Sequence, residues 1–151
     1  MLGDLSEQEM NSLLENQLVG RIGCHTDGEI FVVPITYVYK DGYIYGHSRE
    51  GKKIHMMRKN PRVCFEVDEM ESISHWKSVM IWGEYEEMES EKDKADAFKI
   101  LSDRLNNMEA SETMMKPSYD LPNPHPHNAG AKPIAYRIKA LEKSGRYEQK
   151  Y

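Results

Sequence analysis

The chain has 151 residues and a formal net charge of -5. The negative charge argues against a sequence-wide attraction to nucleic acid, and apolar runs such as IFVVPITYVY are too short to span a bilayer. A chain of this length can bury a core of its own, so residues 1–151 are expected to form a single domain.

The N-terminus and the two cysteines indicate a cytoplasmic protein. The opening segment MLGDLSEQEM lacks the basic and apolar segments of a signal peptide. Cys24 and Cys64 lie inside apolar, strand-like runs and do not form a C-x-x-C pair. Buried, reduced thiols are therefore expected, with a disulfide or redox pair as the alternative.

A helix is expected within the N-terminal segment 1–18. Ser6 and Glu9 have the spacing of a capping box, and the apolar residues Met10, Leu13 and Leu14 repeat at helical spacing. A second amphipathic helix is predicted over 90–106, where apolar residues again recur on one face.

Runs rich in β-branched and aromatic residues predict strands through most of the chain. Asp-Gly pairs at 27–28 and 41–42 indicate tight hairpins. Pro34 cannot donate to a sheet ladder, so it is expected at an edge, at a bulge or where the strand turns to face a ligand. The predicted strands are 19–25, 30–39, 43–48, 62–69, 76–89 and 132–147, the last with an irregular tail; a short helix over 51–60 follows the third.

Residues 111–131 are rich in proline and histidine and are expected to form a long loop. Its HPH sequence, His125–His127, offers imidazoles for a metal ion, but Asp120 alone stands near them as a further ligand. No metal site is expected, and the loop is interpreted as a lid or as a segment that orders the tail.

Successive hairpins and two amphipathic helices predict a mainly β protein. Six mostly antiparallel strands can close into a small barrel, which removes exposed sheet edges, and the helices would flank or plug it.

The segment HSREGKK, residues 47–53, is a candidate phosphate site. It places a hydroxyl, a glycine and two ammonium groups at the start of a helix, where backbone N–H groups lack partners. Lysine is unfavourable at that end of a helix because the macrodipole is positive there, and a bound anion would remove the conflict. The residues by themselves leave two alternatives open, a phosphate cradle and a solvated basic turn.

From residue 19 to residue 146 the chain resembles the pyridoxamine 5′-phosphate oxidase-like FMN-binding split-barrel proteins, in particular the branch that includes nitroimidazole-resistance proteins. The resemblance is carried by four segments in the family's order: VGRIGCHTDGEIFVVPITYVY, YIYGHSREGKKIHMMRKNPRVCFEVDE, WKSVMIWGEYEE and AYRIKALEKSGR. The characteristic C-terminal arginine motif of the oxidases that act on pyridoxamine phosphate is absent from the tail SGRYEQKY. Pyridoxamine phosphate oxidase activity itself is therefore not expected.

The resemblance implies a homodimer with FMN at the subunit interface. It implies that the phosphate is held by Lys52 and Lys53 with His47 and Ser48 beside them. The segment Val33, Pro34, Ile35 and Thr36 would present backbone groups to the isoalloxazine where Pro34 breaks the ladder. Ser78 would reach the partner subunit or its flavin.

The expected function is that of an FMN-dependent oxidoreductase. A nicotinamide bound transiently or another donor would reduce the flavin, which would pass electrons to a small planar acceptor such as a nitroaromatic. No catalytic side chain can be named. The alternatives are a non-enzymatic flavin- or haem-binding carrier or sensor and a structural dimer that has lost its cofactor; the presence of Ser48, Lys52 and Lys53 argues against the last.

Overall fold

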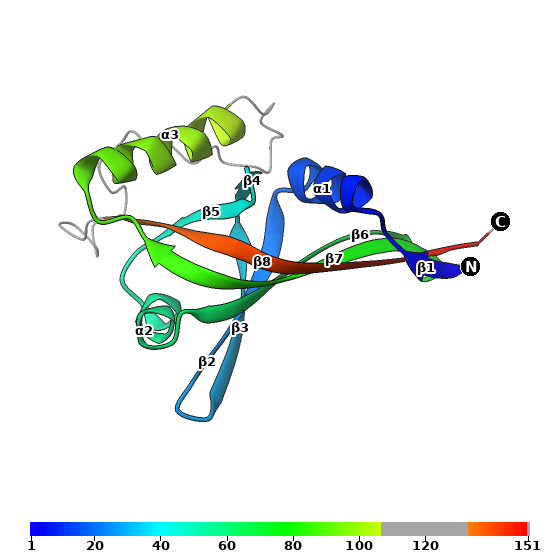
Figure 1. The fold of residues 1–151 in the computed structure, drawn as a ribbon, viewed down its shortest axis with the longest axis horizontal. Coiled ribbons are helices and arrows are strands. Elements are labelled where there is room, and N and C mark those ends of the chain that lie inside the picture. Colours follow the sequence, from blue (N-terminus) through cyan, green and yellow to red (C-terminus); the bar gives the residue numbers. More distant parts are fainter. Residues whose placement is uncertain (107–132, 151) are drawn as a thin grey trace.

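The computed structural model describes residues 1–106 and 133–150 as one antiparallel sheet with three helices (Figure 1). The predicted loop 111–131 lies outside the described residues. The elements are β1 (Leu2–Asp4), α1 (Glu7–Asn16), β2 (Val19–Thr26), β3 (Glu29–Thr36), β4 (Val38–Lys40), β5 (Tyr43–Ser48), α2 (Lys52–Lys59), β6 (Arg62–Ser72), β7 (His75–Glu87), α3 (Glu91–Asn106) and β8 (Ile134–Gln149).

The sheet curls because its two ends belong to one stretch of chain. The strand order is β3-β2-β6-β7-β8-β5-β4, with β1 added to β8, and every described pair is antiparallel. The strands at the two ends of this order, β3 and β4, are separated in sequence by Tyr37 alone. The prediction of a mainly β, antiparallel barrel with flanking helices is confirmed.

Local signals set the helix starts and the hairpins. Ser6 Oγ accepts from the Glu9 amide, while the Glu9 carboxylate accepts from the Ser6 amide, which completes the predicted capping box. Asp27 and Gly28, like the second Asp-Gly pair, have positive φ, as a tight hairpin turn requires. Both predicted hairpins form.

The barrel interior is filled by alternate residues of each strand. Tyr37 and Phe65 are fully buried and meet edge to face, with ring centroids 4.8 Å apart. The Tyr37 hydroxyl donates to the Leu14 carbonyl oxygen at 2.7 Å, so this buried hydroxyl also fastens α1 to the barrel.

Three details differ from the sequence-based expectation. The run 30–39 is interrupted at Tyr37 and not at Pro34, because the Tyr37 amide bonds to the Leu18 carbonyl oxygen and its side chain turns into the core. The predicted irregular tail is wrong, since β8 continues to Gln149 by pairing with β7. An unpredicted strand, β1, pairs with β8; together with the division of the run 30–39 into β3 and β4, this gives the described chain eight strands and not six.

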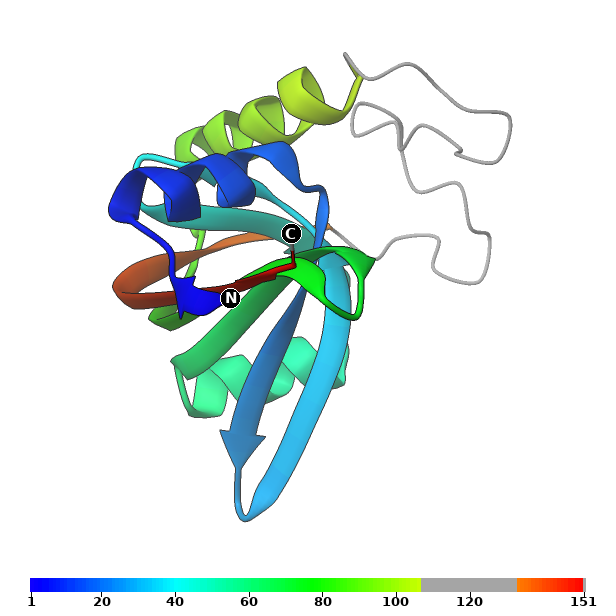
Figure 2. The same cartoon turned by 90° about the vertical axis from the view of Figure 1, so that its right-hand side faces the viewer.

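The helices lie on two sides of the sheet. Figures 1 and 2 both show α1 and α3 on one side and α2 on the other, close to β2, β3 and the end of β5. The hairpin of β2 and β3 projects from the body on the side of α2. This arrangement brings the turn between β5 and α2 next to that hairpin.

Candidate functional site

The predicted phosphate residues come together around the start of α2. His47 and Ser48 end β5, Lys52 and Lys53 begin α2, and a short turn, residues 49–51, joins them. We call His47, Ser48, Gly51, Lys52 and Lys53 the cradle. Its members are contiguous in sequence, so their grouping requires only that the strand end and the helix start where predicted.

Lys53 carries a positive charge that has no partner within the described part of the chain. Its side chain is partly buried, and neither an ion pair nor a hydrogen bond of its ammonium group occurs among residues 1–106 and 133–150. Burial lowers the pKa of Lys53, and the Cys24 thiol nearby opposes that effect. A partly desolvated, uncompensated ammonium group favours the binding of an anion.

Lys52 differs because a carboxylate already neutralises it. Its ammonium group forms an ion pair with Glu29 at the start of β3. It also lies 5.1 Å from the centroid of the Phe31 ring. The projecting β2–β3 hairpin supplies both contacts, so the two lysines of the cradle are not equivalent.

His47 and Ser48 supply the neutral polar groups of the cradle. Burial, with a smaller contribution from the nearby Lys53 charge, lowers the pKa of His47 from 6.5 to about 4. The imidazole is therefore neutral at pH 7. The Ser48 hydroxyl donates to the Arg49 carbonyl oxygen at 2.9 Å, so it has to rotate out of that bond before it can donate to a ligand.

The N-terminus of α2 has no side-chain cap. Gly51 occupies the N-cap position and cannot provide one, which leaves the first-turn amides without a side-chain acceptor. Its backbone is extended (φ 179°), and an added Cβ would meet only the Arg49 carbonyl oxygen at 3.8 Å. Neither strain nor crowding by the described residues demands glycine here, so the missing side chain leaves room for a ligand.

The segment Val33–Thr36 lies on the edge strand β3, close to the barrel closure. Pro34 is exposed and stands opposite Arg21 in a ladder that continues to Thr36, so it does not break the pairing with β2 as the sequence analysis expected. A proline is tolerated because β3 has β2 on one side only among the described strands. The free edge presents backbone groups to any ligand beside it.

Ser78 is not part of the cradle. It lies on β7, and its hydroxyl donates to Glu66 at 3.3 Å. Arg21 bonds both Glu66 and Asp68, at 3.5 and 3.3 Å, and burial together with Asp68 raises the pKa of Glu66. Within one chain, Ser78 therefore belongs to a separate charged cluster on the outside of the sheet.

An apolar row crosses the outer face of the same sheet. The register places Val32 opposite Gly23, Gly23 opposite Cys64 and Cys64 opposite Trp82, so all four lie on one face. Val32 is 64% exposed and Trp82 41% exposed. A row of exposed apolar groups across several strands is typical of a surface that another molecule covers.

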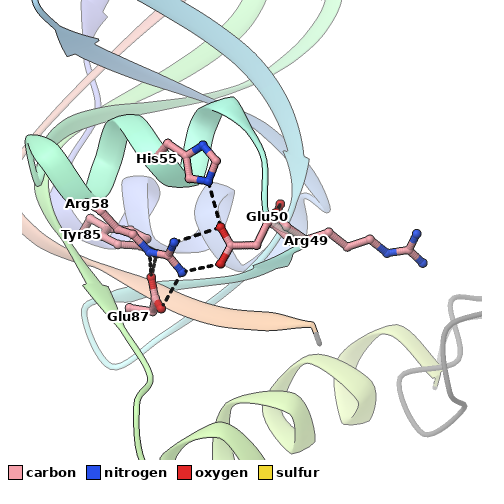
Figure 3. A network of polar contacts seen from close by, with 7 residues as sticks. Arg49, Glu50, His55, Arg58, Tyr85 and Glu87 are labelled. Atoms are coloured by element: carbon pink, nitrogen blue, oxygen red, sulfur yellow. Dashed lines mark hydrogen bonds and ion pairs between the residues drawn. The ribbon is translucent and has the colours of Figure 1, made fainter. Parts of the chain in front are cut away.

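Sequence reasoning missed an ion-pair network that borders the cradle (Figure 3). Glu50, in the turn between β5 and α2, forms ion pairs with Arg58 and His55 of α2, and Arg58 also binds Glu87 at the end of β7. The Tyr85 hydroxyl donates to Glu87 at 2.7 Å. No local pattern could indicate this network, because Glu87 lies far along the chain from Glu50.

Other surface features of the described residues contribute nothing to the cradle. A depression lined by His25, Thr26, Asp27, Lys59 and Asn60 includes none of its members. In residues 1–106 and 133–150, no group of three or more metal-ligating side chains could hold a metal ion. No helix in those ranges has the length and apolarity to cross a membrane.

A family model and a solved structure each match most of the chain. The sequence model of the family described as pyridoxamine 5′-phosphate oxidase matches residues 6–146. The crystal structure of an FAD-binding protein of Mesorhizobium loti is 31% identical, with a TM-score of 0.74 and coverage of 99% of each chain.

Two further matches are weaker. An uncharacterised protein of Rhizobium meliloti is 34% identical over 84 residues; the match covers 56% of this chain and 56% of that protein, little more than half its length. The crystal structure of a candidate 5-nitroimidazole antibiotic resistance protein of Bacteroides thetaiotaomicron has a TM-score of 0.72 at 18% identity, covering 97% of this chain and 87% of that one. The last likeness shows the fold alone.

Proposed function

The chain belongs to the pyridoxamine 5′-phosphate oxidase-like family and has its split-barrel fold, and from this premise we propose that it is a flavoprotein that holds FMN by its phosphate at the cradle. The observation that carries the proposal is the uncompensated, partly buried ammonium group of Lys53 at an uncapped helix N-terminus. A phosphate would supply both the missing counter-charge and the missing acceptor.

The residues present fit a phosphate group. Lys53 supplies charge and the first-turn amides of α2 supply donors, and the Ser48 hydroxyl becomes a further donor once it rotates away from the Arg49 carbonyl oxygen. Charge-assisted hydrogen bonds contribute about 1.5–3 kcal/mol each, so three of them could supply much of the ~8 kcal/mol of a micromolar complex. Lys52 would contribute less while Glu29 neutralises it.

The other parts of the flavin fit other parts of the barrel. When bound, FMN supplies two-electron redox chemistry, and the protein binds and orients it. The free backbone edge at Val33–Thr36 is available to the polar edge of the isoalloxazine. A bound phosphate would also favour the protonated imidazole of His47, which is neutral without it.

The proposal includes a homodimer with the flavin at the subunit interface. Supporting it, Val32 and Trp82 of the apolar row are exposed in one chain, and Ile30 beside the row is 75% exposed. A second copy would cover these groups and bring the Ser78 cluster of one subunit toward the flavin of the other.

Light scattering on size-exclusion fractions tests the dimer. Val32→Glu is expected to give monomers, because a carboxylate would be buried in the interface. The matched control is Ile73→Glu, in the turn between β6 and β7, which is expected to leave the mass unchanged. A Val32→Glu protein of unchanged mass would place the interface elsewhere.

The proposed activity is reduction of a small planar acceptor by the bound flavin, with a reduced nicotinamide as transient donor. The free thiols Cys24 and Cys64 agree with the reducing cytoplasm as its location. The test is anaerobic mixing of FMN-loaded protein with NADH or NADPH while flavin absorbance is followed. If neither bleaches the flavin, and the chemically reduced flavin does not reduce a nitroaromatic, the oxidoreductase proposal is wrong and a carrier or sensor becomes the better reading.

Cofactor identity is decided by titrating the purified protein with FMN, FAD and riboflavin and following flavin fluorescence and absorbance. FMN is expected to bind more tightly than riboflavin, because only FMN carries the phosphate. Tighter binding of FAD would indicate the dinucleotide named for the Mesorhizobium loti relative. Equal affinities for FMN and riboflavin would reject the cradle as a phosphate site, and a Soret band in the purified protein would indicate haem.

A further inference from the structure

We propose that Glu50, Arg58 and Glu87 form a clamp that fixes the turn between β5 and α2 in the conformation that binds a phosphate group. The inference rests on the proposed function, since it concerns the same phosphate cradle. It makes Arg58 and its two carboxylates positioning residues, because they act through the turn and need not touch the ligand.

The clamp uses all three nitrogens of the Arg58 guanidinium group (Figure 3). Arg58 Nη1 and Nη2 each donate to a different Glu50 carboxylate oxygen at 2.9 Å. Nε and Nη2 donate to the two Glu87 oxygens at 2.7 and 3.0 Å. Two bidentate contacts hold the guanidinium plane, and with it Glu50, in a defined orientation.

The far end of the clamp is anchored in the barrel. The Tyr85 hydroxyl, whose aromatic ring is buried against Tyr136, donates to Glu87. Arg58 lies on the last turn of α2, a helix that is held in place by the buried side chains of Ile54 and Met57. The clamp therefore links the exposed turn to two elements that the core already holds in place.

The near end of the clamp, Glu50, lies in the turn that joins the two parts of the cradle. Glu50 stands between Ser48 and Lys53 in the chain, and its carboxylate also accepts a hydrogen bond from His55 Nε2 at 2.9 Å. The next residue, Gly51, meets almost nothing around its α-carbon. A turn with a glycine at this point has many accessible conformations, so a side-chain tether at Glu50 removes conformations that do not bind phosphate.

The charge of Glu50 and its proposed positioning role predict changes of opposite sign in anion affinity when Glu50 is replaced. Its carboxylate is a negative charge close to a site proposed for an anion, so removing that charge would by itself strengthen anion binding. A positioning role predicts weaker binding instead, because the turn loses its tether. The sign of the change in affinity therefore separates the two explanations.

The test compares FMN with riboflavin in Glu50→Gln and Arg58→Gln proteins. Riboflavin shares the isoalloxazine and ribityl chain but lacks the phosphate, so it reports damage to the rest of the site. The matched control is Arg137→Gln, which removes a guanidinium–carboxylate pair of the same 2.7 Å length between β8 and Glu86 of β7, whose side chain points to the opposite face of the strand from Glu87. Dissociation constants are measured by fluorescence quenching, with thermal unfolding of each variant recorded alongside.

For the clamp we expect the FMN dissociation constant to rise about tenfold in Arg58→Gln and severalfold in Glu50→Gln. Riboflavin affinity should stay constant in both variants, and Arg137→Gln should change neither ligand. Amide hydrogen exchange of residues 49–53 in the unloaded protein should become faster in Arg58→Gln and stay unchanged in Arg137→Gln.

Three results would overturn the clamp: tighter FMN binding by Glu50→Gln, equal losses of FMN and riboflavin affinity, or an Arg58→Gln protein with wild-type FMN affinity. Failure of the underlying function looks different. If the proposed function is wrong, the wild-type protein itself will bind FMN no better than riboflavin, or will bind neither. Both the flavin proposal and the clamp inference would then be rejected.

Discussion

The two charged clusters at the ends of α2 use similar side chains in opposite ways. In the cradle, at the start of the helix, Lys53 has no counter-charge among the described residues and His47 is held neutral by burial. In the clamp, Arg58 of the last turn of the helix is paired with the carboxylates of Glu50 and Glu87.

The difference shows how binding sites can be distinguished from scaffolding. Paired charges satisfy one another within the chain and stabilise its shape, whereas an unpaired and partly desolvated charge is unfavourable until a ligand arrives. Lys52 lies between these cases, because it belongs to the cradle by sequence but is already paired with Glu29.

The largest expected effect is the pH dependence contributed by His47. Above pH 6.5 its imidazole is neutral in the folded and the unfolded chain, so the full stability is present. As pH falls from 6.5 toward about 4, the unfolded chain binds a proton that the folded protein does not, and the free energy of unfolding decreases by up to roughly 3 kcal/mol. Urea unfolding between pH 4 and 7 measures it.

The matched variant is His47→Gln, whose unfolding free energy should change much less over that interval. NMR titration of the imidazole adds a direct check, since a folded-state midpoint near 6.5 would contradict the burial of His47. Added FMN should move the midpoint upward if the phosphate lies beside the ring.

Lys53→Ala should have the largest effect on ligand affinity. Loss of the uncompensated ammonium group is expected to weaken FMN binding by about 2 kcal/mol, because a charge-assisted contact to the phosphate disappears. Riboflavin affinity should not change. Lys59→Ala is the control, since that lysine is on the same helix but pairs with Asp27 at 2.9 Å. Equal losses of FMN affinity in the two variants would mean that the net charge of the protein, and not a contact of Lys53 with the phosphate, causes the loss.

Lys52 and Glu29 should give smaller changes of opposite sign. Lys52→Ala is expected to weaken FMN binding by less than about 1 kcal/mol, because an exposed ion pair already neutralises this lysine. Glu29→Gln releases Lys52 and should tighten FMN binding, most clearly at low salt. If Lys52→Ala costs as much as Lys53→Ala, then Glu29 gives up its lysine when the ligand binds, and the two lysines are equivalent after all.

The smallest effect is expected from the clamp in acid. Hydrogen bonds from Arg58 lower the pKa of Glu50 and of Glu87 below the usual 4.5. The stability they contribute is fully present above pH 4.5 and is lost as pH falls through the lowered values, a window below that of His47. Acid unfolding should show a shallower slope below pH 4.5 in Arg58→Gln; an unchanged slope would mean that the clamp does not persist in solution.

Much of the fold could be predicted because its signals are local. The capping box at Ser6 and the Asp-Gly turns each depend on a few neighbouring residues, and each formed as expected. The grouping of the cradle residues could be predicted for the same reason, since His47 to Lys53 is one continuous segment. The break at Tyr37 was missed because that residue leaves the strand to fill the core, and no neighbouring residue indicates that the strand ends there.

By itself, the sequence determined the element types, the mainly β architecture and the set of groups at the start of α2. Only the tertiary structure decided which polar and charged side chains are paired with one another. Glu29 reaches Lys52 through the projecting hairpin, Glu87 reaches Arg58 from the end of β7, and Ser78 meets Glu66 across a sheet register. Each of these pairs joins residues distant in sequence, and such pairing depends on how strands align and helices dock. The alternation of apolar and polar residues within a strand, and their spacing within a helix, do not encode how the elements pair with one another.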